Sequence, residues 1–562
     1  MANRVFSPSK LSVGSKAFWV ILLILGLTIA FPENRAQAAS ITVNSIADTP
    51  TPGDTQCTLR EAVANANSDS DTTGGDCVAG SGTDAIDFTG SVLGQTITLA
   101  GSQITLSSSM TIAASDIGVT LNGNNSSRVF QITVGSTVTL TSLRLTNGNV
   151  TGAGAGIQNL GTLTVNNSTL DANTATTFGG GILSSGSLTV NNTTIRNNSV
   201  ASTGGAQAGG GGISNSGTML LNNATISGNS VSGTATNRNG GGIRNTSGST
   251  ATLNNLTIVN NSTGSNGGGI SDAGAYTMNN TIIANNTAGV SGPDCRGTVT
   301  ANFTLIETIL NCSITGGNNV FNSDPLLTLL DANGGGTISL PTLTHFPLDT
   351  SPALNAGNNV TCLATDERGN PRPVGTCDMG AVEKQTGEET DQHDVWAQGV
   401  PHTFGADVNV TITPNTTDNP GEITVLKRPV FAGLSQDSGE FQIVWTLTAE
   451  FSPYDLDIDF CYTDPELITA GVGDEDSIVI FHLENGVWQA MTTTTNAVTN
   501  CVTVSGVTSL SPWTIVGNGN APTAIELQNL TARAVNSPRS MALALLAILG
   551  LALGVFLVRS RK

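Results

Sequence analysis

The residues of this chain best suited to forming covalent links are its eight cysteines. An even number of cysteines behind an export-type N-terminus predicts disulfides rather than free thiols. Neighbours along the chain are expected to pair, although other connectivities stay open: Cys57 with Cys77, Cys295 with Cys312, Cys362 with Cys377, and Cys461 with Cys501. No two cysteines have CxxC spacing and histidine is scarce, so the pattern does not favour zinc.

Acidic side chains that could cleave a polysaccharide are sparse in the middle of the chain. Hydrolysis needs two carboxylates beside the scissile bond, and a lyase would need calcium-binding carboxylates with a basic residue. Between Ile117 and Pro293 there is no glutamate, and the two aspartates are Asp171 and Asp272. Four arginines of this region are expected to be isolated: Arg144, Arg196, Arg238 and Arg244. We therefore expect no catalytic residue, and a polysaccharide lyase or hydrolase is the alternative.

Three alternating aspartates nearer the C-terminus raise the question of a bound cation. Asp455, Asp457 and Asp459 stand on one face of an expected strand. Calcium is the metal that clustered carboxylates would suit, but the spacing is not that of an EF-hand loop. A solvated strand face is the favoured interpretation, so no cofactor is expected.

A glycine-rich motif recurs through the region that lacks carboxylates. Copies close to GGGI have their last glycine at Gly156, Gly181, Gly212, Gly242 and Gly269. The copies do not follow a strand and open a helix, as phosphate- and dinucleotide-binding loops do. The glycines are therefore interpreted as part of a repeated building unit, where they allow a sharp corner and a close approach of the backbone.

An asparagine pair follows each copy of the motif and sets the register of the repeat. The residue before the pair and the fourth residue after its first member are apolar in all five units. The first members of the pairs are Asn166, Asn191, Asn222, Asn254 and Asn279. Seven residues further on, the units have Asn173, Asn198, Asn229, Asn261 and Asn286. Stacking the units would place the apolar positions in one core and the asparagines in ladders of side-chain amides.

This repeat predicts an all-β solenoid. Short strands rich in Thr, Val and Ile, broken by Gly and Asn, favour a parallel β-helix over a propeller or a helical repeat. Insertions concentrate just before each GGGI motif, and such a corner often lies on the binding face of a solenoid. Ser230–Arg238 is the insertion where specificity is expected.

Charge and the two ends of the chain indicate where the protein acts. The net charge of −20 argues against a nucleic-acid partner, because phosphate binding needs a basic surface. Residues 1–38 have the basic start, apolar core and small-residue end of a secretory signal peptide. Residues 541–558 are apolar and long enough to span a bilayer, and the basic residues 559–562 are expected to stay cytoplasmic. We expect a single-pass membrane protein with its bulk outside the cell.

Two further stretches carry a resemblance to exported bacterial proteins. Cys57–Asn67, CTLREAVANAN, resembles the CSLREA motif, with Thr58 in place of the motif's serine. Ser351–Gly357 together with Asp366–Glu383 resembles the end-of-solenoid segment called choice-of-anchor Q. The repeats between them are similar to those of right-handed parallel β-helices. The resemblance implies a right-handed solenoid displayed at the cell surface, and it implies no catalytic activity.

The expected organisation combines the resemblance with changes in composition along the chain. It comprises a signal peptide (1–38), a CSLREA-like N-terminal cap (39–96), a parallel β-helix (97–340), an anchor-Q-like segment (341–383), an acidic linker (384–397), a β-sandwich module (398–518), a spacer (519–540), a transmembrane helix (541–558) and a basic cytoplasmic tail (559–562). The expected function is that of a membrane-anchored extracellular surface protein with an adhesive or structural role. Its solenoid would contact glycans or cell-surface proteins.

Overall fold

The computed structural model describes most of the chain between residues 38 and 516. Outside the description within that span are residues 116, 272–273, 334–341, 394–395, 406–407, 418–419, 430–439, 451–453, 463–477, 485–486, 497–499 and 511. The expected signal peptide (except residue 38), spacer, apolar segment 541–558 and tail lie outside the described residues. Among the residues that are described, no helix has the length and apolar character needed to cross a membrane.

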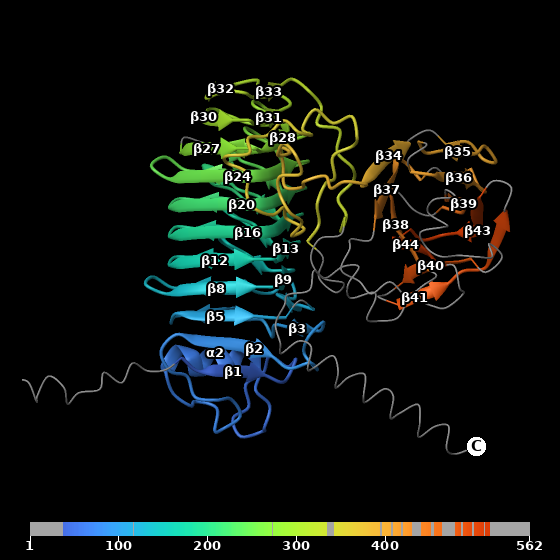
Figure 1. Ribbon diagram of the computed structural model, residues 1–562. Helices are drawn as coiled ribbons and strands as arrows, with labels where there is room; N and C mark the ends of the chain where they lie inside the picture. The colour runs from blue at the N-terminus through green and yellow to red at the C-terminus, as the bar shows by residue number, and fades with distance from the viewer. Residues whose placement is uncertain are drawn as a thin grey trace, which may run out of the picture.

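The described chain is all-β apart from one short helix, and its larger part is a stack of parallel coils (Figure 1). The longest sheet, here called sheet A, takes one or two strands from each coil and pairs them in parallel with the next coil. Its strands are β1 (Ser40–Val43), β2 (Asp84–Phe88), β3 (Thr96–Thr98), β5 (Met110–Ala113), β6 (Val119–Asn122), β8 (Thr137–Thr141), β9 (Leu143–Thr146), β12 (Thr162–Asn166), β13 (Thr169–Asp171), β16 (Ser187–Arg196), β20 (Thr218–Ser227), β24 (Thr250–Val259), β27 (Ala275–Asn279), β28 (Ile282–Ala284), β30 (Gly297–Asn302), β31 (Leu305–Ile306), β32 (Cys312–Thr315) and β33 (Val320–Phe321). The expected parallel solenoid is confirmed, and its pairing begins at β1, well before the boundary expected at residue 97.

Two further parallel sheets form the other sides of the coils. One contains β4 (Ile104–Leu106), β7 (Phe130–Ile132), β11 (Ile157–Asn159), β15 (Ile182–Ser184), β19 (Ile213–Asn215), β23 (Ile243–Asn245) and β26 (Ile270–Ser271). The other contains β10 (Asn149–Val150), β14 (Thr174–Ala175), β17 (Ser199–Ser202), β21 (Ser230–Gly233), β25 (Ser262–Thr263) and β29 (Thr287–Ala288). The longest corner insertions form a small parallel pair, β18 (Gln207–Gly209) with β22 (Asn237–Asn239). Equivalent strands of successive coils therefore pair in parallel in each of these sheets.

Left-handed backbone conformations shape each coil at two corners. The second residue of every asparagine pair has a positive φ: Asn167, Asn192, Asn223, Asn255 and Asn280. The glycine that opens each glycine motif also has a positive φ: Gly154, Gly179, Gly210, Gly240 and Gly267. Asparagine and glycine are the residues that adopt this conformation at least cost. The last glycine has a different role, because a Cβ on Gly181 would lie 2.8 Å from the backbone oxygen of Gly212 in the next coil.

The apolar positions of the repeat stack into one continuous core. The column before the asparagine pair is fully buried in Val165, Val190, Leu221, Leu253 and Met278. The column after the pair is equally buried in Leu170, Ile195, Ile226, Ile258 and Ile283. Each such side chain removed from water stabilises the stack by about 1.5–3 kcal/mol.

Two asparagine ladders run along the stack, and their amides donate in opposite directions. In the buried ladder each amide donates to the next coil, as from Asn198 Nδ2 to Asn229 Oδ1 at 3.0 Å. In the outer ladder each amide donates to the preceding coil, as from Asn222 Nδ2 to Asn191 Oδ1 at 3.0 Å. The buried ladder ends where Asn286 Nδ2 donates to the carboxylate of Asp294 at 2.9 Å. Burial raises the pKa of Asp294 to about 6.

The N-terminal end of the stack is closed by helix α2 (Leu59–Ser68), as Figure 1 shows. Thr58 caps this helix, since its hydroxyl accepts from the Glu61 amide while the Glu61 carboxylate accepts from the Thr58 amide. Leu59 and Val63 are buried against the first coils. Arg60 is paired with Asp48 at 2.8 Å. The polar residues of the helix therefore serve the cap itself.

The C-terminal part of the described chain is an antiparallel sandwich of two sheets. One sheet contains β34 (Glu389–His393), β37 (Ile423–Pro429), β38 (Glu440–Ala449), β44 (Pro512–Val516), β40 (Val479–Glu484) and β41 (Val487–Ala490). The other contains β35 (His402–Thr403), β36 (Val410–Pro414), β39 (Leu456–Cys461), β43 (Cys501–Val507) and β42 (Thr493–Asn496). Phe460 of the second sheet packs between Trp445 and Trp513 of the first, with ring centroids 5.4 Å apart in both contacts. The linker expected at 384–397 is wrong, because Glu389–His393 forms edge strand β34 and pairs with β37.

All eight cysteines are paired in the expected combinations. The disulfides join Cys57 to Cys77, Cys295 to Cys312, Cys362 to Cys377, and Cys461 to Cys501. They lie in the N-terminal cap, the last coils, the segment that follows the solenoid and the sandwich. Each lies outside the five GGGI units, and each closes a loop whose freedom in the unfolded chain is thereby reduced.

Candidate functional site

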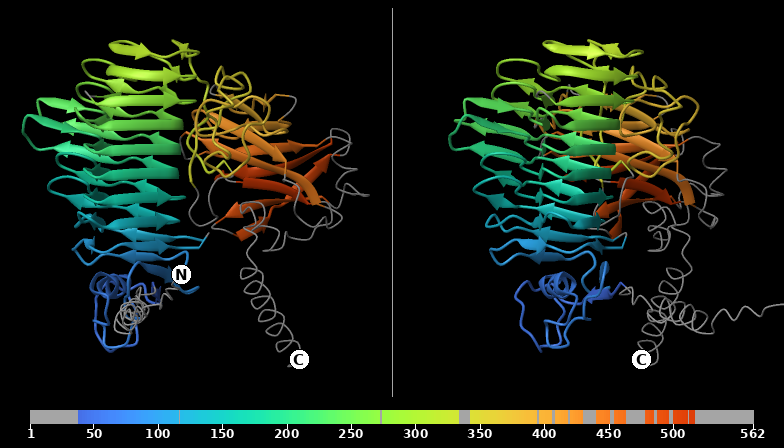
Figure 2. Two further views of the ribbon diagram at one scale, coloured as in Figure 1. Left: turned by 60° about the vertical axis from the view of Figure 1, so that its left-hand side comes forward. Right: turned by 90° about the vertical axis from the view of Figure 1, so that its left-hand side faces the viewer.

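The asparagine pairs divide sheet A into two halves with different surroundings. Each long strand bends at the left-handed asparagine, so residues before and after the pair face different directions. Figure 1 shows the strands before the bend, from β5 to β30, stacked on the side away from the sandwich. Figure 2 shows the segment after the solenoid, in yellow, lying between the coils and the sandwich. One half of the sheet is therefore bare, and the segment covers part of the other half.

The bare half presents two parallel columns of hydroxyl side chains, here called the hydroxyl face. One column contains Thr137, Thr162, Ser187, Thr218, Thr250, Ala275, Thr298 and Ser313. The second contains Thr111, Thr139, Thr164, Thr189, Leu220, Thr252, Thr277, Thr300 and Thr315. All of these side chains are exposed or half-buried, and none carries a charge. Neighbouring hydroxyls lie close enough to bond, as between Ser187 Oγ and Thr218 Oγ1 at 3.1 Å.

A shallow groove of about 520 Å³ runs beside the first column of the hydroxyl face. Its floor contains stacked glycines, and a Cβ on Gly217 would lie only 2.0 Å from the backbone oxygen of Gly186. Its wall is formed by hydroxyl side chains of successive coils, among them Thr162 and Thr218. No carboxylate, histidine or lysine is among the residues that line this groove in the described chain. The groove can contact a ligand by shape and hydroxyl groups, but it offers no acid or base.

The covered half is packed against residues 342–388, here called the terminal segment. Thr194, Thr225 and Thr257 occupy equivalent positions on three successive coils, and each bonds to it. The side chain of Thr225 donates to Glu367 Oε2 at 2.6 Å, and Thr257 accepts from the Ala381 amide at 2.9 Å. The left-handed asparagines Asn223, Asn255 and Asn280 also bond to the segment. The terminal segment therefore covers this half over the coils from β16 to Asn280.

Glu367 is the most unusual titratable group in this contact. It is fully buried, and burial raises its pKa to about 8 although the hydroxyls of Thr225 and Thr194 lower it. At neutral pH the carboxyl group is therefore mostly protonated. A neutral carboxyl costs far less to bury than a carboxylate without a cation. Its position between two threonines of the solenoid marks it as a structural contact.

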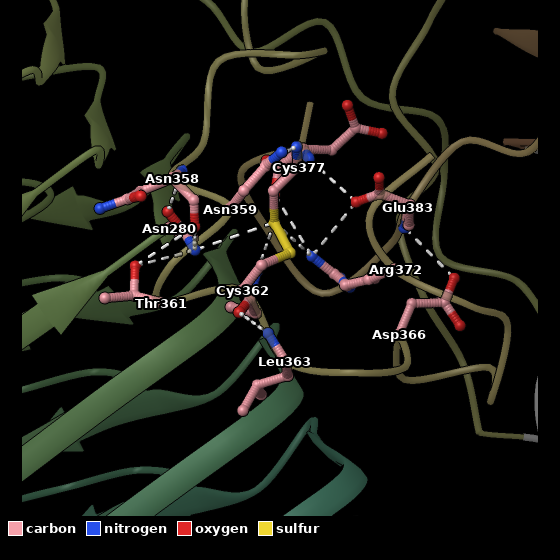
Figure 3. The surroundings of a disulfide bond; sticks show 12 residues. Asn280, Asn358, Asn359, Thr361, Cys362, Leu363, Asp366, Arg372, Cys377 and Glu383 are labelled. Carbon is pink, nitrogen blue, oxygen red and sulfur yellow. Dashed lines mark hydrogen bonds and ion pairs between the residues drawn. A yellow bond between two sulfur atoms is a disulfide. The ribbon is translucent and has the colours of Figure 1, made fainter. Parts of the chain in front are cut away.

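Several other charged residues of the terminal segment form a buried ion network. Arg368 pairs with Asp366 at 2.9 Å and with Glu388 at 2.7 Å, and all three side chains are inaccessible to solvent. Burial alone would lower the pKa of Arg368, but the two carboxylates raise it above its ordinary value. Arg372 lies 3.7 Å from Glu383 beside the Cys362–Cys377 disulfide (Figure 3). These groups hold the segment in its folded form. A separate, partly exposed cluster joins Lys384 to Asp349 at 2.7 Å and to Glu389 at 3.3 Å.

Two sulfur atoms and a carboxylate oxygen lie as close together as the ligands of a metal ion, but their chemistry does not suit a metal. Sulfur atoms of Cys362 and Cys377 and a Glu383 oxygen lie within 4.8 Å of one another. The two sulfurs are joined in a disulfide and so cannot supply thiolates. The Glu383 carboxylate accepts from the backbone amides of Val374 and Asp378 (2.7 and 2.9 Å). The disulfide and the Glu383 carboxylate therefore stabilise the fold of the terminal segment.

The expectation that the arginines near Asp171 are isolated is wrong. Arg144 donates to Asp171 from both Nε and Nη2, at 3.0 and 2.6 Å, and Arg196 approaches the same carboxylate at 3.2 Å. The parallel register places Asp171 directly beside Arg196 of the next coil. The aspartate is thus held by two guanidinium groups, and Asp272 lies outside the described residues.

The corner insertion in which specificity is expected is held in place by hydrogen bonds from its own arginine. Ser230–Arg238 contains β21 and enters β22, and Arg238 donates to the carbonyls of Gly233 and Gly264. Arg244 lies over the ring of Phe178, with its guanidinium 4.9 Å from the ring centroid. Both arginines therefore stabilise the corner, and a role in specificity stays a prediction.

The three alternating aspartates of the sandwich face hydrogen-bond donors of their own sheet. Asp455 and Asp457 both accept from Asn415 Nδ2, at 2.9 and 2.8 Å, and Asp457 also accepts from the Gly506 amide. Asp459 accepts from the Thr503 hydroxyl at 2.5 Å. All three carboxylates therefore accept hydrogen bonds from donors of their own sheet.

Sequence reasoning missed the hydroxyl face, although the signal was present in the repeat. Thr or Ser stands four and two positions before the first asparagine of each pair, as in Thr162 and Thr164 before Asn166, except at Leu220 and Ala275. Those positions alternate with buried ones, so they point outward.

Comparisons of the chain with protein-family models, with curated proteins and with solved structures found no match.

Proposed function

We propose that this chain is an extracellular surface protein, anchored in a membrane by residues 541–558, with an adhesive or structural role. Export by residues 1–38 would place the solenoid in an oxidising compartment. Four disulfides and no free cysteine among the described residues support that location. The CSLREA-like cap, the anchor-Q-like segment and the right-handed sense of the solenoid belong to the same proposal.

The observation that carries the proposal is the division of sheet A. Glu367 is committed to the contact between the terminal segment and the solenoid, and Asp366 and Glu388 are committed to Arg368 within the segment. The bare half offers hydroxyl groups and a groove, and its lining lacks the paired carboxylates that hydrolysis requires. Such a surface suits contact without turnover.

The orientation of the chain can be tested on intact bacteria that express it with two epitope tags. One tag is added after Lys562, and the other is inserted at the exposed turn of Gly204 and Gly205. Protease added outside should remove the inserted tag and leave the C-terminal tag until the cells are lysed. Loss of both tags, or of neither, would contradict a single-pass surface protein.

Adhesion without catalysis is tested with the purified full chain. It is incubated with acidic and neutral polysaccharides, and released sugar and unsaturated products are measured over hours. We expect no turnover on any of them. Sustained product formation that is lost in a heat-denatured control would replace the adhesive role with the enzyme alternative.

A further inference from the structure

We propose that the hydroxyl face binds the surface of ice. The juxtaposition behind this proposal is two columns of threonines and serines, exposed or half-buried, repeated coil after coil on the bare half of sheet A. The proposal goes beyond surface display and does not depend on the membrane anchor. It concerns what the bare half would recognise.

The spacing of the hydroxyl groups is that of a two-dimensional lattice. Parallel pairing places equivalent side chains about 4.8 Å apart along the stack, and alternate residues of one strand about 6.6 Å apart across it. The register is uninterrupted from Thr162 through Ser187 and Thr218 to Thr250 in the first column. These two repeats lie close to the repeats of oxygen atoms on the surface of hexagonal ice.

The chemistry of the columns suits ordered water. Each threonine offers a hydroxyl group, which can donate and accept like a water molecule, beside a methyl group that water must surround. The two breaks in the columns are Leu220 and Ala275, which are also small to medium apolar groups without charge. A charged side chain would hold its own hydration shell against the ice lattice, and the columns contain none.

A glycan is the other ligand that a solenoid face could meet, and the same residues fit it less well. Ligand sites with strong specificity use aromatic platforms and a few convergent polar groups. Neither column contains an aromatic side chain, and the hydroxyls point outward in parallel from successive strands. A flat array suits an extended flat surface better than a single chain of sugars.

The rigidity of the face also favours a crystalline partner. The outer asparagine ladder runs along one edge, with Asn254 Nδ2 bonded to Asn222 Oδ1 at 3.0 Å. Stacked glycines form the opposite edge at the groove, where successive backbones approach closely. The hydroxyl groups are therefore held in place before binding, so little conformational entropy is lost when a lattice is met.

The experiment compares the purified full chain with two double variants and one control. Thr164→Lys with Thr189→Lys places two ammonium groups in the middle of the second column. Thr164→Val with Thr189→Val keeps the volume and removes two hydroxyl groups. Thr287→Lys places the same ammonium on an exposed position of β29, on another side of the coils. Each protein is frozen slowly from dilute solution, and the share found in ice is measured beside the growth rate of ice crystals.

We expect the wild-type chain and Thr287→Lys to enter the ice and slow its growth. The lysine pair should reduce the share in ice about tenfold or more, since each ammonium must lose water to approach the lattice. The share of the valine pair in ice should lie between those of the wild-type chain and the lysine pair. Because valine keeps the volume of threonine, such an intermediate share shows that the loss is not due to misfolding. Exclusion of the wild-type chain from ice would overturn the proposal. Equal partition of all four proteins into ice would also overturn it. So would binding of the wild-type chain to immobilised glycans, if the lysine pair abolishes that binding and no protein enters ice.

Discussion

The two halves of sheet A have the same backbone and opposite surroundings. Thr189 and Thr225 both project outward from strands of this sheet, yet Thr189 faces solvent and Thr225 is buried against Glu367. The repeat builds both halves in the same way, so their difference comes from residues 342–388 alone. A long-range segment therefore decides which hydroxyls become structural and which remain available for contact.

The ion network of the terminal segment should give the largest loss of stability. Arg368→Met would leave Asp366 and Glu388 buried without their cation, which typically costs about 3–5 kcal/mol. Hydrogen exchange of peptides from residues 342–388 would report this as faster opening of the covered half. The matched control is Arg296→Met, since Arg296 is exposed and its replacement should change stability by less than about 0.5 kcal/mol. Equal exchange in both variants would show that the network does not hold the segment.

A pH dependence should follow from Glu367. Its pKa is about 8 in the folded chain and ordinary, near 4.5, when unfolded, so the folded form binds the extra proton. The stability it supports is present below the lower value and is lost as pH rises through the upper one, at about 1.4 kcal/mol per pH unit between them. Glu367→Gln should flatten this slope, as measured by hydrogen exchange of residues 342–388 from pH 5 to pH 8. An unchanged slope in the variant would assign the dependence to another group.

A pair of identical substitutions separates the covered half from the bare half. Thr225→Val removes the donor to a buried carboxyl and should destabilise by about 1–3 kcal/mol. Thr189→Val should change stability by less than about 0.5 kcal/mol, because its hydroxyl faces water and its neighbour across the pair is already Leu220. Urea unfolding followed by hydrogen exchange in β16 and β20 measures both. Similar losses would mean that the bare half is also covered.

The repeat allowed the solenoid to be predicted, because its register follows from local rules. Positive φ at Asn192 and Gly179 is favoured by these residue types wherever they occur, and the apolar columns follow by stacking. The terminal segment could not be derived in this way, since Thr225 and Glu367 are 142 residues apart and share no periodic signal. The pairing of Asp171 with Arg144 and Arg196 joins three successive coils, so it depends on the register between coils and not on residue types within one coil. The polar sequence of β34 predicts a linker, because an edge strand needs few apolar residues and so carries little signal.

The most direct test of the divided sheet uses single cysteines on intact cells that express the full chain. Thr164→Cys lies on the hydroxyl face, and Thr194→Cys lies under the terminal segment, where its hydroxyl contacts Glu367. The native cysteines are all paired in the described chain, so a membrane-impermeant maleimide should react with the introduced thiol. We predict fast labelling of Thr164→Cys and labelling of Thr194→Cys only after denaturation. Equal labelling of both variants, or labelling of Thr164→Cys only after lysis, would contradict an exposed binding face at the cell surface.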